Sequence, residues 1–177
     1  AERIAEIREA IRRSERPCIV AGGGVIAAGA SEELFRFADS YRIPVATTLM
    51  GIGSFPETHP LSLKWLGMHG SYYANYAVNE CDLLLVLGAR FADRSTGRAD
   101  RFAEHAFIVH IDIDESEINK NVRAGLGLAA DVKEALALLN REPFDTGCGA
   151  WLETIAGWKR EQPFRYRREP GRLKGQQ

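Results

Sequence analysis

The sequence predicts an α/β fold of the doubly wound type, in which helices cover both faces of a mostly parallel β-sheet. Three observations support this prediction. The candidate strands are continuous apolar runs, which is typical of parallel strands that are buried on both faces. Segments with helical periodicity alternate with these runs, so helices would connect successive strands. Glycines and polar residues follow the runs directly, at the edge where such sheets bind ligands.

The candidate elements follow one another from the N-terminus. Ile4, Ile7 and Ile11 are three and four residues apart, which predicts an amphipathic helix that ends before Pro17. Ser31 is expected to be the N-cap of the next helix. The further helices are expected at 31–42, 115–122, 131–140 and 150–161, and the strands within 18–24, 43–53, 81–91, 107–114 and 126–130.

Composition excludes several classes of function. The chain has 177 residues, which predicts one main domain, and its 23 basic and 24 acidic side chains provide no bulk charge for binding nucleic acid. No apolar stretch reaches the ~20 residues that a membrane span requires, and we find no signal peptide. The three cysteines form no metal-binding or disulfide pattern, which suits a reducing compartment. We therefore expect a cytoplasmic globular protein without nucleic-acid or membrane partners.

We expect the domain to occupy residues 1–150 and a C-terminal helix and linker to occupy residues 151–177. From Lys159 onward the chain carries seven Lys or Arg residues against Glu161 and Glu169, together with two prolines. This segment has no apolar periodicity beyond the helix. The composition predicts a linker or mobile terminus.

The loop after the first strand, "AGGGVIAAGAS", can be interpreted in two ways. Glycines let a ligand approach the backbone, and free amides near a helix N-terminus bind phosphate oxygens. However, the Rossmann fingerprint is G-x-G-x-x-G, and Gly29 does not stand at the third position after Gly22 and Gly24. A tight strand-to-helix turn is the alternative, and this loop alone does not decide between them.

Two later loops also follow strands. "TTLMGIG" (residues 47–53) offers hydroxyls and glycines, although such a stretch is more often a turn than a site. In "LGARFADRSTGR" (residues 87–98), Arg90 could pair with a phosphate and Phe91 could stack on a flat ring. No catalytic motif of the nucleophile-elbow, P-loop or zinc-protease type occurs.

The segment "HIDIDESE" (residues 110–117) allows a metal site or a nucleotide contact. Asp112 and Asp114 are two residues apart, so both would face the same side of a strand. Asp114 also stands three residues before Glu117, which is a capping-box spacing. We favour a cap at Asp114 and a ribose hydrogen bond at Asp112 over a metal. Asp131 has the same capping spacing to Glu134.

The phrase "LGMHGSYYANYAV" (residues 66–78) has an unusual composition. It places Met68 and His69 between glycines and follows them with three tyrosines and an asparagine among small residues. Neither a strand nor a buried helix requires this composition. The phrase therefore indicates a contact surface for a ligand.

Four stretches together resemble the central domain of acetolactate synthase, a three-domain thiamine diphosphate enzyme. They are "VAGGGV", "TTLMGIGSFPETHPL", "LGMHGSYYANYAVNECDLLLVLGARFADRSTG" and "HIDIDESEINKN". The resemblance covers roughly residues 15–140 and is most specific in the third stretch. In that family this run lies along a bound FAD.

The resemblance implies an FAD site built from the loops after the strands. The glycine loop would approach the diphosphate. The flavin would lie against residues 48–49 and 66–69, and the middle of the cofactor against residues 88–92. The adenosine end would be held by residues 112–113 and 131–132. The implied positions are Gly22, Gly23, Gly24, Thr48, Leu49, Leu66, Gly67, Met68, His69, Gly88, Ala89, Arg90, Phe91, Ala92, Asp112, Ile113, Asp131 and Val132. The family usually has a carboxylate where this chain has Ala92, and a glycine where it has Ala130.

The resemblance implies a full enzyme that decarboxylates pyruvate on thiamine diphosphate and joins the product to a second 2-oxo acid, for branched-chain amino acid biosynthesis. The net reaction transfers no electrons, so FAD would be largely structural. The G-D-G motif that holds Mg²⁺ and thiamine diphosphate in this family does not occur in these 177 residues. We therefore expect no catalytic residue and no metal ligand here.

The resemblance also implies partners: N- and C-terminal domains of the same chain, a homodimer or homotetramer, and a regulatory subunit as a further candidate. Two rival hypotheses stay open. The chain could be the central domain of another thiamine diphosphate decarboxylase or oxidase, or an interaction domain that binds no ligand.

Overall fold

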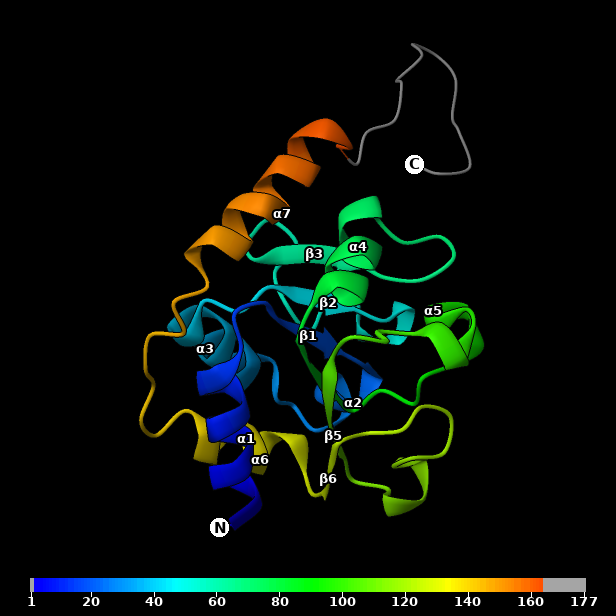
Figure 1. Ribbon diagram of the computed structural model, residues 1–177. Helices are drawn as coiled ribbons and strands as arrows, with labels where there is room; N and C mark the ends of the chain where they lie inside the picture. Colours follow the sequence, from blue (N-terminus) through cyan, green and yellow to red (C-terminus); the bar gives the residue numbers. More distant parts are fainter. Residues whose placement is uncertain (1, 164–177) are drawn as a thin grey trace.

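The computed structural model describes residues 2–163 and contains a six-stranded sheet in which all neighbouring strands are parallel (Figure 1). The strands lie in the order β3-β2-β1-β4-β5-β6, so the chain builds outward from β1 in one direction and then, from β4, in the other. This is the strand order of the Rossmann fold. The bounds are β1 (Pro17–Ala21), β2 (Val45–Thr47), β3 (Ser62–Trp65), β4 (Leu83–Leu87), β5 (Phe107–Asp112) and β6 (Leu126–Ala129).

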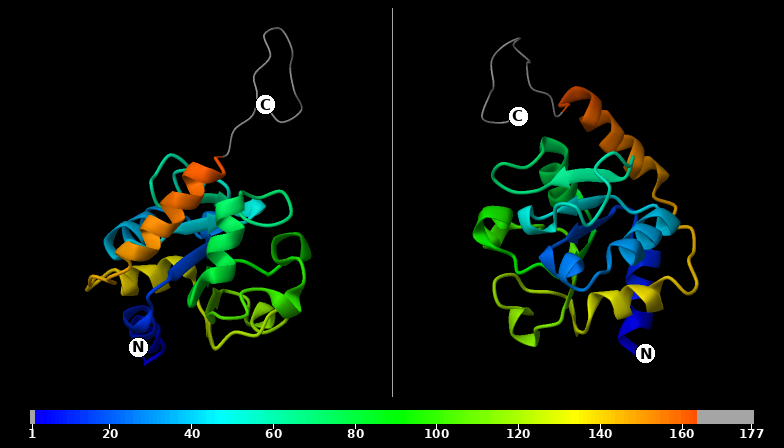
Figure 2. Two further views of the ribbon diagram at one scale, coloured as in Figure 1. Left: turned by 45° about the horizontal axis from the view of Figure 1, so that its top comes forward. Right: turned by 180° about the vertical axis from the view of Figure 1, so that it is seen from behind.

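Helices cover both faces of the sheet, so the predicted doubly wound α/β fold is confirmed. One face carries α1 (Glu2–Arg13), α2 (Gly23–Ala27), α3 (Ser31–Tyr41) and α6 (Val132–Leu139). The other face carries α4 (Tyr72–Glu80) and α7 (Gly149–Glu161), which lie side by side (Figure 2). No described helix is long and apolar enough to cross a membrane.

Alternating side chains of the central strands divide the core into two clusters. Ile19 and Leu85 point into the cluster beneath α1, α3 and α6, whereas Val20 and Val86 point into the cluster beneath α4 and α7. Every residue of β1 and of β4 is buried. The uninterrupted apolar runs of the sequence are therefore the consequence of burial on both faces.

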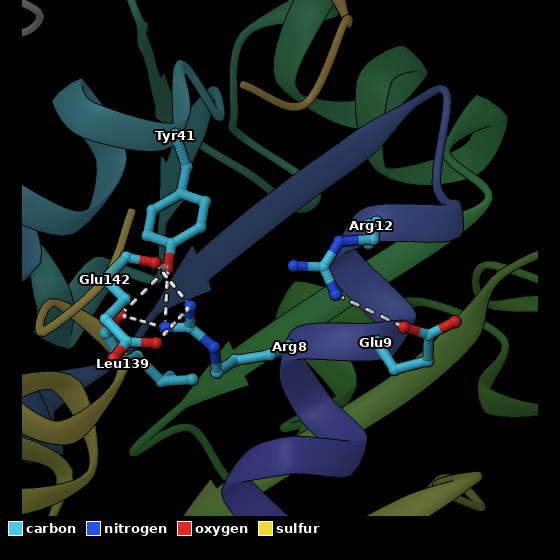
Figure 3. A network of polar contacts seen from close by, with 6 residues as sticks. All are labelled: Arg8, Glu9, Arg12, Tyr41, Leu139 and Glu142. Carbon is cyan, nitrogen blue, oxygen red and sulfur yellow. Dashed lines mark hydrogen bonds and ion pairs between the residues drawn. The ribbon is translucent and has the colours of Figure 1, made fainter. Parts of the chain in front are cut away.

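Three elements of one face are joined by a polar network around the C-terminal end of α6 (Figure 3). The Tyr41 hydroxyl donates to the Leu139 carbonyl oxygen at 2.8 Å, and Arg8 Nη1 donates to the same oxygen at 3.1 Å. Arg8 also donates to the carbonyl oxygen of Glu142. Because the last carbonyls of a helix lack intrahelical donors, these bonds satisfy α6 and tie it to α1 and α3.

Several local expectations were wrong. Ser31 is the first residue of α3 and not its N-cap, which is Ala30 without a side-chain cap bond. The helix expected at 115–122 is only a 3₁₀ turn, η3 (Glu115–Glu117). Neither β3 nor the short helix α2 was predicted from the sequence, and residues 72–80 were not expected to form the helix α4. The remaining short elements are α5 (Asp93–Thr96), η1 (Leu49–Gly51) and η2 (Ala99–Arg101).

The C-terminal helix α7 packs against the body of the fold. Trp151 and Ile155 are buried in the cluster beneath α4, and the Trp151 indole donates to the Pro17 carbonyl oxygen at 3.1 Å. Most of the basic segment that the sequence predicts to be a linker or mobile terminus lies in 164–177, outside the described residues.

Candidate functional site

The loops that follow the six strands form a continuous rim at the carboxyl edge of the sheet. Backbone hydrogen bonds join them one residue beyond each strand: Leu66 to Thr47, Thr48 to Ala21, Gly22 to Leu87, Gly88 to Ile111 and Ala130 to Asp112, each from amide to carbonyl at 2.8–3.0 Å. The ladder of the sheet thus extends into the loops that contain the predicted site. The rim is a preorganised surface because the sheet holds its backbone.

Close backbone packing explains the glycines at the centre of this rim. A Cβ on Gly24 would lie 2.7 Å from the Gly88 Cα, and one on Gly22 would overlap the Gly88 carbonyl oxygen. Gly88 itself has a φ of +56°. Glycine is therefore required at these three positions by the chain itself, whether or not a ligand is bound.

Most of the glycine-loop amides are already used within the fold. The Gly22 amide donates to the Leu87 carbonyl at 2.8 Å and the Gly24 amide to the Gly88 carbonyl at 3.0 Å. These two amides are therefore not available to phosphate oxygens, as the ligand-binding interpretation of the loop would require. Gly23 is the first residue of α2, where an amide has no intrahelical acceptor, so its amide is the one that a ligand could reach.

The "LGMHG" segment folds back as a turn after β3 and is held from two sides. The Gly67 amide and carbonyl are both bonded by the Asn75 side chain, with Oδ1 accepting at 2.8 Å and Nδ2 donating at 3.0 Å. The Met68 amide donates to the Arg94 carbonyl at 3.0 Å. Gly67 has a φ of +106°, and a Cβ there would overlap the Arg94 backbone. The asparagine of the unusual phrase therefore fixes the turn.

Large apolar side chains are exposed along the same rim. Leu49 and Met50 follow β2, Met68 follows β3 and Ile113 follows β5, and each is 70–75% exposed. A single exposed leucine needs no explanation, but several on the loops of one sheet edge indicate a binding surface. Met50 also contacts the glycine loop, because a Cβ on Gly23 would lie 3.1 Å from the Met50 Cβ.

Four apolar residues of the predicted site have buried side chains and could meet a ligand only through their backbone. They are Leu66, Ala89, Phe91 and Val132, all less than 9% exposed. The Phe91 ring packs against Phe102 and His110, with ring centroids 5.8 and 4.9 Å away, and is not presented for stacking. Its backbone has a φ of +51°, unusual for a bulky residue.

The remaining predicted residues lie at the rim with accessible surface. Arg90, Ala92 and His69 are exposed, whereas Thr48 and Gly88 are partly buried. The Arg90 carbonyl accepts from the Asn121 side chain at 2.9 Å, which ties the loop after β4 to the segment after η3.

The aspartates after β5 and β6 have assigned local roles. Asp131 caps α6, with Oδ1 accepting from the amides of Lys133 at 2.7 Å and Glu134 at 3.2 Å. Asp114 accepts from the Ser116 amide, and its hydrogen bonds with the Ser116 side chain and then with this amide lower the pKa of its carboxyl. Both capping predictions are confirmed, although the element that Asp114 caps is the η3 turn.

Asp112 ends β5 with its carboxylate at the rim. Oδ1 accepts from the Asp114 amide at 3.0 Å, and Oδ2 lies 3.9 Å from Nε2 of the buried His110. The carboxylate is only partly engaged and could accept a further hydrogen bond. Among residues 2–163 no group of three or more His, Cys, Asp or Glu side chains is arranged to hold a metal ion.

Three residues of this rim were not among the predicted site residues. Thr47 is buried and its hydroxyl oxygen has no hydrogen-bond partner within residues 2–163. Met50 and Asn75 contribute the contacts described above. Thr47 and Met50 are in the "TTLMGIG" segment and could have been included, whereas the role of Asn75 depends on a contact that only the fold creates.

The strand order of the parallel sheet reverses between β1 and β4, and the rim is rich in glycine. These two features define a Rossmann-type α/β domain. The chain belongs to the thiamine pyrophosphate enzyme family: the model of the family's central domain matches residues 4–139.

Individual relatives of the chain are acetolactate synthases. The chain is 54% identical over 157 residues to the probable acetolactate synthase large subunit of Methanocaldococcus jannaschii, covering 86% of this chain and 26% of that protein. It is 47% identical over 174 residues to acetolactate synthase 1, chloroplastic, of Zea mays, covering 94% and 27%. The resemblance to acetolactate synthase central domains is thereby confirmed. The chain spans about a quarter of the length of these relatives.

Proposed function

We propose that this chain is the FAD-binding central domain of an acetolactate synthase. The observation that carries the FAD assignment is the row of exposed apolar side chains along the carboxyl edge, beside the Asp112 carboxylate and the unpaired Thr47 hydroxyl. Apolar walls with a few polar groups are the composition of a small-molecule site. A flat flavin ring and a polar adenosine end match these two kinds of surface.

The extent of this row favours an elongated ligand. Met68 follows β3 and Ile113 follows β5, and four inter-strand spacings of ~4.8 Å separate these strands, roughly 19 Å in all. A mononucleotide would cover only part of this distance. A dinucleotide such as FAD would reach the apolar residues at one end and Asp112 at the other.

On this proposal, Leu49, Met50 and Met68 bind the flavin end. The Gly23 amide donates to the diphosphate, and Asp112 accepts from a ribose hydroxyl. When bound, FAD would be a structural cofactor, because the proposed carboligation transfers no net electrons. Apolar residues with buried side chains, such as Phe91, would contact FAD only through their backbone.

Titration of the purified chain with FAD, followed by flavin fluorescence, tests this proposal, with ADP and NAD as comparators. Met68→Ala should weaken FAD binding roughly tenfold, the effect of one lost large apolar contact, and leave ADP binding unchanged. Asp112→Asn should weaken both ligands, because both carry the adenosine ribose. An equal effect of Met68→Ala on FAD and ADP would contradict the proposed orientation.

The glycine loop provides a matched pair of variants. Gly23→Leu would place a side chain against Met50, between the glycine loop and the proposed flavin end, and should abolish FAD binding. Gly149→Ala is the control, because a Cβ there meets no atom within 4 Å and α7 begins away from the rim. Circular dichroism of both variants confirms that the fold is retained. FAD binding by a folded Gly23→Leu variant would exclude the diphosphate from this loop.

The resemblance to acetolactate synthase large subunits further supports a complete enzyme that works with thiamine diphosphate and Mg²⁺. We propose that other domains of the same protein hold these two cofactors. We also propose that the enzyme functions as a homodimer or homotetramer in the cytoplasm, with a regulatory subunit as a further partner.

A further inference from the structure

A buried histidine lies directly beneath the carboxylate that we assign to the ribose. His110, in β5, is 0% exposed; the Ala89 backbone acts on its ring, but neither ring nitrogen makes a hydrogen bond of full geometry with a group in residues 2–163. Buried polar groups are nearly always hydrogen-bonded, so an unpaired imidazole calls for an explanation. The charged group beside it is Asp112, whose Oδ2 lies 3.9 Å from Nε2.

The residues around His110 pack against its ring but do not lie between Nε2 and the Asp112 carboxylate. The edge of Phe91 packs on the imidazole with ring centroids 4.9 Å apart. The charged groups of the described chain that act on it are Asp112 and, more weakly, Glu117, whose carboxylate pairs with Lys120 at 2.6 Å. Burial lowers the pKa of His110, while Asp112 and the nearby Ala89 backbone act in the opposite direction.

We propose that His110 is a positioning residue that orients Asp112 toward the adenosine ribose and makes cofactor affinity dependent on pH. This inference rests on the proposed function. The neutral imidazole donates its Nε2–H to Oδ2 as the site tightens around a ligand, which leaves the outward lone pairs of the carboxylate for the ribose hydroxyl. A protonated imidazole draws the carboxylate inward as an ion pair and weakens it as an acceptor.

The sign of the pH dependence follows from this competition. A ligand that needs the outward carboxylate binds better to the form with neutral His110, so affinity falls when the pH drops through the pKa of His110. That pKa is lowered by burial from the ordinary value of ~6.5. FAD should therefore bind with constant affinity at pH 7–8 and about fivefold more weakly once the pH falls through the lowered pKa of His110.

Two substitutions separate positioning from packing. His110→Gln keeps an N–H donor near Asp112 but cannot titrate. Its FAD affinity at pH 7.5 should be close to that of the unchanged chain, and it should not change when the pH is lowered to 5.5. His110→Leu fills the space without a donor and should bind more weakly at both pH values. If His110 only packed against its neighbours, the FAD affinity of the unchanged chain would not depend on pH. Equal affinity of the unchanged chain at the two pH values, or an unaltered pH slope in His110→Gln, overturns the inference.

An NMR titration of the imidazole tests the same pair without any ligand. The His110 resonance, identified by its loss in His110→Gln, should titrate at lower pH in Asp112→Asn than in the unchanged chain, because the neighbouring negative charge is removed. An unaltered pKa overturns the coupling between the two residues. If the chain binds neither FAD nor ADP at any pH, the proposed function fails, and this titration still decides whether His110 and Asp112 are coupled.

Discussion

At the residue scale, the glycines of the rim show how a ligand pattern can have a structural cause. Gly22 and Gly24 pack against the backbone of Gly88, and their amides donate to carbonyls of the neighbouring loop and strand. The sequence indicates that glycine is needed there. It does not indicate that the close neighbour is another part of the same chain, because Gly88 is more than sixty residues away.

Gly22→Ala should therefore destabilise the fold in the absence of any cofactor. Its Cβ would overlap the Gly88 carbonyl oxygen, which is backbone and cannot rotate away. We expect a loss of about 1–3 kcal/mol, the usual cost of overpacking, in the free energy of unfolding measured with urea. Gly149→Ala, where a Cβ meets nothing, should change stability by less than ~1 kcal/mol. Equal stability of the two variants would contradict the close packing at Gly22.

Asn75 is the residue whose role the sequence least reveals. Its side chain bonds both the amide and the carbonyl of Gly67 across a gap of eight residues. Composition alone gives an asparagine in a tyrosine-rich phrase, which is equally compatible with an exposed helix position. The three-dimensional turn after β3 decides its function.

Asn75→Ala should loosen the turn that presents Met68. Two hydrogen bonds are lost, which should cost about 1–3 kcal/mol in unfolding free energy. It should also weaken FAD binding while sparing ADP, because the affected loop lies at the flavin end of the proposed site. Asn79→Ala, at an exposed position of the same helix, is the matched control in both the urea and the fluorescence experiments. Loss of ADP affinity in Asn75→Ala would show that the turn does more than present the flavin end.

At the element scale, the sequence predicts the central strands and the edge strand β6 well but does not predict the other edge strand, β3. β1, β4 and β5 are long apolar runs because helices bury both of their faces. β3 contains Ser62 and Lys64 and lies at the sheet edge, so it lacks that pattern. Helix α4 buries alanines and Tyr73 and has little amphipathic contrast, so periodicity does not identify it.

The edge strand is instead fixed by a lysine from α7. Lys159 Nζ donates to the carbonyl oxygens of Pro60 and Ser62, each at 2.7 Å, and lies 5.6 Å from the centre of the Tyr73 ring. Burial, together with the nearby charge of Lys64, lowers the pKa of Lys159 to about 8. A neutral amine still has two hydrogens to donate, so both bonds can persist after deprotonation.

This lysine should make stability increase with pH in the alkaline range. Between pH 8 and the ordinary lysine value of ~10.4, the unfolded chain binds a proton that the folded chain has lost, so the free energy of unfolding rises with pH. Below pH 8 both states are protonated and the contribution is constant. Lys159→Met should remove this rise in a series of urea unfolding curves from pH 7.5 to 10. Lys133→Met, at a more exposed position, should keep the rise in unfolding free energy with pH. If the rise is unaltered in Lys159→Met, other groups cause it.

At the scale of the whole molecule, the sequence predicts the class of the fold because parallel order, helical crossovers and strand-end loops all follow from one pattern of burial. The same reasoning selected the loops after β1, β2, β4 and β5 as the candidate site. It does not show which side chains of those loops reach the surface, because Phe91 and Leu66 are buried by segments distant in sequence. Their exposure is a property of tertiary packing.

On the proposed function, this chain binds FAD and other domains of the protein carry out catalysis. No G-D-G motif is present in the sequence, and the described rim contains apolar side chains, an aspartate and backbone amides but no constellation of acid, base and nucleophile. We therefore expect the 177-residue chain to bind FAD yet form no acetolactate from pyruvate when thiamine diphosphate and Mg²⁺ are supplied. Colorimetric detection of acetolactate provides the assay, with the longer protein that includes the flanking coding sequence as the positive control. Product formation by the isolated chain would contradict the assignment of catalysis to other domains, and a longer protein that binds thiamine diphosphate without carboligation would favour the decarboxylase or oxidase alternative.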